Sequence, residues 1–221
     1  MKTPSKSENY VPALGYAPFT RYYDIVVGLT TREKIFKRAL IAQAEIESGA
    51  EVLDVACGTG TLAIWLKARH PEASVTGIDG DPTILKIART KTDKAGVAIR
   101  FDQGLSFDMP YSDDTFDAVV SSLFFHHLSR EMKERTASEI HRVLKPGGMI
   151  HIADWGKPVN FLMGLLYYGI QLLDGFVNTN DNRQGLLLQI IENAGFEDVQ
   201  LRQTFSTMFG TMALYSGRKC R

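Results

Sequence analysis

The stretch Leu53-Asp-Val-Ala-Cys-Gly-Thr-Gly60 decides the fold of this chain. It closes a short apolar run and precedes a pattern typical of a helix over 61–70, which Pro71 ends. Its two glycines, together with Ala63, match the pattern G-x-G-x-x-A, in which the backbone approaches a ligand and the helix packs closely on the strand. The stretch therefore predicts a strand, a glycine-rich turn and a helix that together receive a nucleoside.

The same alternation of strand and helix repeats along the chain. Asp81 as an N-cap and Pro82 at the first helical position predict the start of a second helix, which ends near Gly96. The run Lys145-Pro-Gly-Gly148 predicts a tight turn. This order predicts a parallel sheet with helices on both faces. Strands are expected at 51–55, 74–79, 97–103, 116–122 and 149–154, and a further helix at 129–144.

Both ends of the chain depart from that alternation. Thr30 and Glu33 have the spacing of a capping box, which predicts a helix from there to about Gly49. A bulky apolar insertion follows Trp155, and a helix is expected after it at 184–194. Two late strands with no helix between them are predicted to be antiparallel. They are expected at 197–203 and 211–219.

The composition narrows the class of partner. Lys plus Arg and Asp plus Glu both total 25, so no basic excess favours nucleic acid, and a small molecule is the expected substrate. The two cysteines offer neither a disulfide framework nor a metal-ligand pattern, and no metal is expected. The chain has no secretory signal pattern or apolar run long enough for a transmembrane segment, and a cytoplasmic location is expected.

Asp54 decides which nucleoside ligand the turn accepts. A carboxylate in an apolar strand just before the turn would repel the pyrophosphate of a dinucleotide in a partly desolvated cleft. The same carboxylate attracts S-adenosylmethionine, which carries an ammonium and a sulfonium and has no phosphate. Asp79, at the end of the second strand, can accept both ribose hydroxyls of either ligand and does not discriminate between them.

At these residues the chain resembles the class I S-adenosylmethionine-dependent methyltransferases, and more narrowly the group that includes the ubiquinone and menaquinone C-methyltransferases. The resemblance covers roughly residues 22–158 and returns near the carboxyl end. It rests on 53–60, Ile78-Asp79, the segment 103–110, the segment 116–128 and the run 142–148. Leu105 departs from the Asp or Asn of many relatives, and Ala56 stands where many have glycine.

The resemblance implies a Rossmann-like α/β methyltransferase fold: a mostly parallel seven-stranded sheet with helices on both faces and an antiparallel strand near the carboxyl end. Residues 1–48 would form a helical cap, and 49–221 the core, with a substrate-side insertion at about 157–183. The expected cofactor is S-adenosyl-L-methionine, which leaves as S-adenosyl-L-homocysteine. Its expected contacts are Tyr23, Asp54, Ala56, Cys57, Gly58, Thr59, Gly60, Asp79, Gly80, Leu105, Ser106, Ser122 and Leu123.

The acceptor is expected to be small and hydrophobic or aromatic, methylated on oxygen, nitrogen or carbon. Alignment and exclusion of water supply much of the rate of such a displacement. If a base assists, His126, His127 and Asp154 stand where the fourth and fifth strands end, with the two histidines preferred. Tyr22, Trp155, Tyr167 and Tyr168 are candidates for acceptor binding, although aromatic residues at helical spacing also simply pack.

Three alternatives stay open from the sequence. The chain could be an NAD(P)-dependent oxidoreductase, which Asp54 disfavours, or a catalytically silent module that binds a cofactor or a partner. The apolar insertion could also contact a membrane surface peripherally or a second subunit, so that the protein is a monomer or a homodimer.

Overall fold

The structure is a computed structural model that describes residues 32–220, apart from the side chains at 173 and 174. The described chain alternates strands and helices up to Trp155, except that no helix separates the third strand from the fourth, and it ends in a long hairpin. Its elements, in chain order, are α2 (Glu33–Gln43), β1 (Glu51–Val55), α3 (Thr61–Arg69), β2 (Ser74–Asp79), α4 (Pro82–Ala95), β3 (Arg100–Gln103), β4 (Phe116–Ser122), the short 3-10 helix η1 (Phe125–His127), α5 (Arg130–Val143), β5 (Leu144–Trp155), α6 (Phe161–Asp174), α7 (Phe176–Gln184), α8 (Leu187–Asn193), β6 (Phe196–Thr207) and β7 (Gly210–Lys219).

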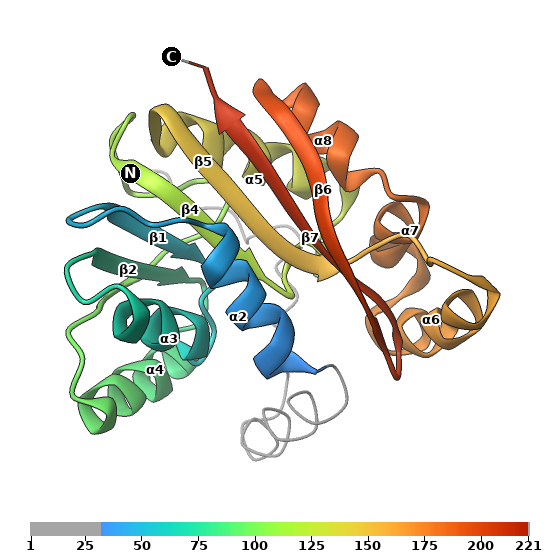
Figure 1. Cartoon of the computed structure of the whole chain (residues 1–221), viewed down its shortest axis with the longest axis horizontal. Helices are drawn as coiled ribbons and strands as arrows, with labels where there is room; N and C mark the ends of the chain where they lie inside the picture. The colour runs from blue at the N-terminus through green and yellow to red at the C-terminus, as the bar shows by residue number, and fades with distance from the viewer. Residues whose placement is uncertain (1–31, 221) are drawn as a thin grey trace, which may run out of the picture.

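The strands form one seven-stranded sheet in the order β3-β2-β1-β4-β5-β7-β6 (Figure 1). The five strands from β3 to β5 are parallel, whereas β7 lies antiparallel to both β5 and β6. This confirms the predicted mostly parallel sheet and its antiparallel carboxyl-terminal part. From β1 the chain adds β2 and β3 on one side, and it then adds β4 and β5 on the other side of β1. Open α/β sheets bind ligands at such a reversal of strand order, which here lies between β1 and β4.

Helices cover both faces of the sheet because alternate residues of each strand point to opposite sides. On β1, the side chain of Val52 packs with Phe36 and Leu66 from α2 and α3. Leu53 instead packs with Ile140 and other residues from α5 and α8. Figure 1 shows α2 and α3 on the near side of the sheet and α5 on the far side. Helix α2, expected as part of a cap, thus also contributes buried residues to the core.

The first described helix is shorter than predicted at both ends. It begins at Glu33 after Arg32, whose φ of 59° is left-handed, and Arg32 makes no side-chain cap. The proposed capping partner Thr30 lies outside the described residues, and Glu33 is the first helical residue rather than the third. The helix ends at Gln43 because Glu45, with φ of 44°, leaves the helical path well before Gly49. The predicted bounds were therefore wrong.

The expected tight turn at 145–148 is a bulge within β5. The strand pairs Phe116 with Leu144 and then Ala118 with Met149, so extra residues on β5 loop out without ending the strand. Asp117, the residue of β4 between the two pairs, accepts hydrogen bonds from Lys145 Nζ at 2.8 and 2.9 Å. That ion pair keeps the bulged segment against β4, whereas proline and glycine alone predicted a turn.

The helix expected at 184–194 is also divided. Helix α7 ends at Gln184, and Gly185 takes a left-handed φ of 79° that satisfies the last carbonyls of α7. Helix α8 then begins at Leu187. The final hairpin is longer than predicted, because β6 continues to Thr207 and β7 begins at Gly210.

Candidate active site at the carboxyl ends of the parallel strands

The glycine-rich turn links the ends of β1 and β2. The backbone N–H of Cys57 donates to the carbonyl of Ile78 at 3.0 Å, and that of Gly58 donates to Asp79 Oδ2 at 2.9 Å. Gly60 precedes α3 with φ of 75°, and a Cβ there would lie 3.1 Å from the ring of Phe101. The residues expected to contact the cofactor through this turn are therefore held together by backbone bonds, and only glycine fits at position 60 without displacing the neighbouring ring.

Ala56 takes a left-handed conformation, with φ of 56°, between β1 and the turn. An L-residue with a Cβ is strained there, whereas glycine is not. Ala56→Gly is expected to raise the free energy of unfolding by about 1 kcal/mol, measured by denaturant titration. The matched control is Ala68→Gly in the helical interior of α3, which should lower it by a similar amount. Destabilisation by Ala56→Gly would show that the conformation stores no strain.

Asp54 is the most unusual group at this edge of the sheet. Its side chain is 1% exposed, and its Oδ2 has no hydrogen-bond partner among the described residues. Burial raises the pKa of Asp54 from 3.8 to about 7; the charge of Lys37 opposes this shift and that of Asp79 adds to it. A buried carboxylate oxygen without a partner is costly unless a ligand donates to it.

These features fit a cationic nucleoside ligand. An ammonium beside Asp54 would supply both the missing donor and the missing positive charge. Asp79 accepts from the backbone N–H groups of Gly58 and Asp81, and each carboxylate oxygen retains a further lone pair for a ribose hydroxyl. Burial raises the pKa of Asp79, and the backbone N–H groups of Asp81 and Gly58, which bind its charged form, oppose this shift. A pyrophosphate would bring further negative charge to the buried carboxyl of Asp54 and the half-buried carboxyl of Asp79.

The segment expected to meet the adenine lies beside the end of β2. The N–H of Gly104 donates to the carbonyl of Asp79 at 3.1 Å, and Gln103 Nε2 contacts the carbonyl of Gly80 at 3.4 Å. Leu105 is half-buried and bridges to Asp108. The Ser106 hydroxyl is 2.9 Å from that of Thr136 on α5, so its side chain is engaged there. Any contact of Ser106 with an adenine would come from its backbone, as the sequence indicated.

The end of β4 turns sharply beside β5. Ser122 is half-buried, and Leu123 has a left-handed φ of 56° while its N–H donates to the carbonyl of Ala153 at 2.8 Å. The preceding Ser121 is fully buried and donates its hydroxyl to the carbonyl of Val55 at 3.0 Å. Of the two serines, Ser121 ties β4 to β1, and Ser122 is the one placed at the end of the strand.

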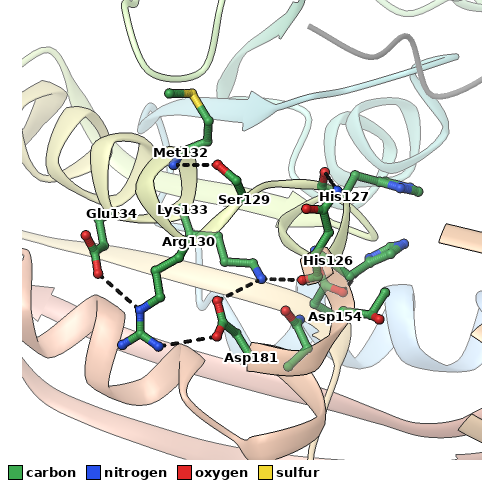
Figure 2. A network of polar contacts seen from close by, with 12 residues as sticks. His126, His127, Ser129, Arg130, Met132, Lys133, Glu134, Asp154 and Asp181 are labelled. Atoms are coloured by element: carbon green, nitrogen blue, oxygen red, sulfur yellow. Dashed lines mark hydrogen bonds and ion pairs between the residues drawn. The ribbon is translucent and has the colours of Figure 1, made fainter. Parts of the chain in front are cut away.

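The three candidate catalytic residues lie together just beyond this turn (Figure 2). His126 Nδ1 is 2.6 Å from Asp154 Oδ1, and both side chains are buried. Asp154 also accepts backbone N–H groups from Phe124, His126 and Trp155. Burial acts to raise the pKa of Asp154, but His126 and these backbone donors hold it below its usual value. Asp154 is thus ionised, and its two oxygens already contact the backbone N–H groups of the turn and the His126 imidazole.

His127 lies against His126, with ring centroids 4.0 Å apart. Burial, aided by the neighbouring His126, lowers the pKa of His127 from 6.5 to about 3. His127 is therefore a neutral imidazole at physiological pH. His151 is buried on β5, and its Nδ1 lies 3.2 Å from Gln43 Nε2.

The aromatic candidates for acceptor binding separate into three groups. Trp155 is 3% exposed and packs edge-on against Tyr167, with ring centroids 6.4 Å apart. Tyr167 is fully buried, and its hydroxyl donates to the carbonyl of Thr179 at 3.1 Å. Tyr168 lies on the outer side of α6, where the Arg183 guanidinium stacks on its ring at 4.5 Å. Tyr22 lies outside the described residues, as does Tyr23, which was expected to contact the cofactor. Acceptor binding by Tyr22, Trp155, Tyr167 and Tyr168 stays a prediction, and so does the cofactor contact of Tyr23.

Helix α6 leaves much apolar surface exposed. Phe161 is 89% exposed, and Leu172 is 76% exposed. Within the described residues, no helix combines the length and the apolar character that crossing a membrane requires. The predicted contact with a membrane surface or a second subunit stays a prediction.

Several polar residues at the site were not foreseen from the sequence. Lys37 on α2 lies close enough to Asp54 to influence its pKa. Lys133 is buried on α5 on the same side as Thr136, Ala137 and Ile140. A lysine on the apolar side of a predicted helix was the available signal. Asn178 and Asn182 on α7 gave no comparable signal, because their partners are backbone carbonyls far away in sequence.

Comparison with known proteins supports the class of protein that the sequence predicts. Residues 52–148 match the family model described as a methyltransferase domain. The demethylmenaquinone methyltransferase of Symbiobacterium thermophilum is 30% identical, in an alignment covering 99% of this chain and 96% of that protein. That of Deinococcus radiodurans is 36% identical over 60% of this chain, which spans only 54% of that protein. No relation to dinucleotide-dependent oxidoreductases follows from these matches.

The fold itself also has a solved counterpart. The crystal structure of a putative methyltransferase from Bacillus halodurans superposes with a TM-score of 0.66 at 24% identity, covering 84% of this chain and 99% of that one. At that identity the likeness concerns the fold alone.

Proposed function

Because the chain belongs to the group of class I S-adenosylmethionine-dependent methyltransferases that contains the ubiquinone and menaquinone C-methyltransferases, we propose that it methylates a ring carbon of a small, hydrophobic, hydroxylated aromatic such as a quinol. The observation that carries this proposal is the buried His126–Asp154 pair at the ends of β4 and β5, on the same edge of the sheet as the cofactor turn. The two relatives described above are named demethylmenaquinone methyltransferases, which supports a quinol as the class of acceptor.

On the cofactor side, Asp54 would hold the ammonium, Asp79 the ribose hydroxyls, and the turn at Gly58 the intervening backbone. When bound, S-adenosylmethionine supplies a methyl group on a sulfonium, whose neutral thioether is a good leaving group. The protein then has to align the acceptor carbon, exclude water and remove a proton.

On the acceptor side, we assign the role of base to His126. Asp154 is ionised and only 2.6 Å from Nδ1, which favours the tautomer with the proton on that nitrogen and leaves the lone pair on Nε2. Nε2 would take the proton of a ring hydroxyl, which enriches the adjacent ring carbon in electrons. After this carbon has taken the methyl group, its own hydrogen leaves as a proton to the ring oxygen, which restores the aromatic hydroxyl. The charge of Asp154 stabilises the imidazolium that forms. Neutral His127, whose ring lies 4.0 Å from that of His126, adds no competing positive charge.

A panel of acceptors tests this proposal. The purified full chain is incubated with S-adenosylmethionine and, separately, demethylated quinols, catechols and aromatic amines, and S-adenosylhomocysteine is measured by mass spectrometry. We expect turnover with the quinols, and we expect NMR of the product to place the new methyl on a ring carbon. Methylation of oxygen or nitrogen would overturn the assigned acceptor atom. Cofactor binding without turnover on any acceptor would instead favour the silent module.

A further inference from the structure

A partly buried chain of hydrogen bonds connects helix α5, through helix α7, to the turn that carries His126 and His127, here called the histidine turn. Lys133 Nζ, on α5, donates to the carbonyl of Asn178 at 2.6 Å. The Asn178 side-chain Nδ2 then donates to the carbonyl of His127 at 3.0 Å. Residues at three separate places in the sequence are thereby joined at the end of β4, and Figure 2 shows Lys133 extending toward the His126 and Asp154 side chains.

A lysine is energetically unfavourable at the buried position 133. Its side chain is 0% exposed, and a buried ammonium costs several kcal/mol unless it is paired. Its ionic partner is Asp181 of α7, whose Oδ2 lies 3.4 Å from Lys133 Nζ. The other oxygen of Asp181, Oδ1, forms an ion pair with the more exposed Arg130 at 3.3 Å. The negative charge of Asp154 acts on Lys133 in the same direction as that of Asp181. Lys133 therefore lies between a carboxylate of the insertion and the carboxylate that orients His126.

Helix α7 also makes a side-chain hydrogen bond to the backbone at the end of β5. Asn182, one helical turn after Asn178, donates its Nδ2 to the carbonyl of Trp155 at 3.0 Å. The two asparagines thus bind the backbone beyond β4 and the backbone at the end of β5. These are the two segments that carry His126 and Asp154. The insertion is consequently hydrogen-bonded to the backbone that carries the candidate catalytic residues.

We propose that Lys133 and Asn178 are positioning residues, which set the place of the histidine turn relative to the acceptor by fixing the carbonyl of His127. This rests on the proposed function, because the turn is assigned there as the source of the base. Neither side chain needs to touch the substrate. A displacement of the histidine turn by even a fraction of an ångström should lower the rate without changing how the cofactor binds at the glycine-rich turn between β1 and α3.

Two variants and one matched control test this. Asn178→Leu removes the donor to His127 while it preserves the size of the side chain, and Lys133→Met removes the ammonium. Arg130→Gln is the control, since it also removes an ion pair to Asp181 but leaves Asn178 and His127 untouched. We expect kcat to fall about 10- to 100-fold in both test variants, with the dissociation constant for S-adenosylmethionine within about twofold of wild type. Arg130→Gln should retain wild-type kcat.

A second readout does not depend on turnover. The imidazole protons of the five histidines can be followed by NMR, with those of the distant His70, His141 and His151 as internal references. In Asn178→Leu, the resonances of His126 and His127 should shift and titrate differently, while the references stay in place. Wild-type kcat and unshifted resonances in Asn178→Leu would overturn the proposal, as would an equal loss of activity in Arg130→Gln. If wild type methylates no acceptor, the proposed function fails, and the NMR comparison still decides whether the network places the turn.

Discussion

Replacing His126 with alanine is expected to lower kcat for methyl transfer by about 10²- to 10⁴-fold, the usual contribution of a positioned general base. The affinity for S-adenosylmethionine should change little, because Asp54 and Asp79 lie on the neighbouring strands. Steady-state kinetics with a saturating quinol, combined with calorimetry of cofactor binding, separates the two effects. His70→Ala is the control, since His70 ends α3 away from the histidine turn, and it should leave kcat unchanged.

Asp154→Asn tests the same assignment through the tautomer. An amide cannot stabilise an imidazolium as a carboxylate does, so kcat should fall again. Far-UV circular dichroism checks that the variant keeps the secondary structure of the wild type, because Asp154 also accepts backbone N–H groups from Phe124, His126 and Trp155. Full activity in His126→Ala would remove the histidine from the mechanism and leave alignment as the main source of rate.

Asp54→Asn is expected to have opposite effects on binding and on stability. Affinity for S-adenosylmethionine should fall by about tenfold or more, because a buried ammonium loses its charged partner. The ligand-free protein should gain about 2–4 kcal/mol of unfolding free energy at pH 8. The sign follows from the raised pKa of about 7 against an ordinary 3.8. The folded state binds more protons than the unfolded state between these values, so the contribution of protonated Asp54 to wild-type stability is complete below about pH 4 and is lost as pH rises through about 7. The gain from Asp54→Asn is therefore largest above pH 7.

The same linkage predicts how pH changes cofactor binding. A cation beside Asp54 favours the ionised carboxyl, so binding near pH 7 should release a proton, and the affinity should rise between pH 6 and pH 8. Calorimetry in buffers of different ionisation enthalpy measures that release. Asp54→Asn should abolish it, whereas Asp93→Asn, an exposed change on α4, should not. An unchanged affinity in Asp54→Asn, or tight binding of NADH, would contradict the cationic ligand on which the assignment rests.

The sequence by itself determined the class of the protein and predicted the residues on the cofactor side of its candidate site. Strand, glycine-rich turn and helix are local patterns, because a cap, a helix stop or an apolar strand involves residues only a few positions apart. Asp54 and Asp79 follow two successive strands, and adjacent parallel strands bring their carboxyl ends together, so the order of elements along the chain is enough to predict that the two carboxyls lie close together. The mostly parallel seven-stranded sheet and its antiparallel carboxyl-terminal part were also predicted and are confirmed. The order of the strands across the sheet was not predicted.

The tertiary structure decided the acceptor side. The sequence offered two histidines and an aspartate without relating them, and only packing of β4 against β5 brings His126 within 2.6 Å of Asp154. Lys133 and Asn178 are 45 positions apart, and their bond depends on how α7 docks on α5. The bulge at Lys145 depends in the same way on Asp117 in another strand. Local signals could not predict these contacts, because each is a hydrogen bond or ion pair made across the fold, whose partner is chosen by packing rather than by neighbouring residues.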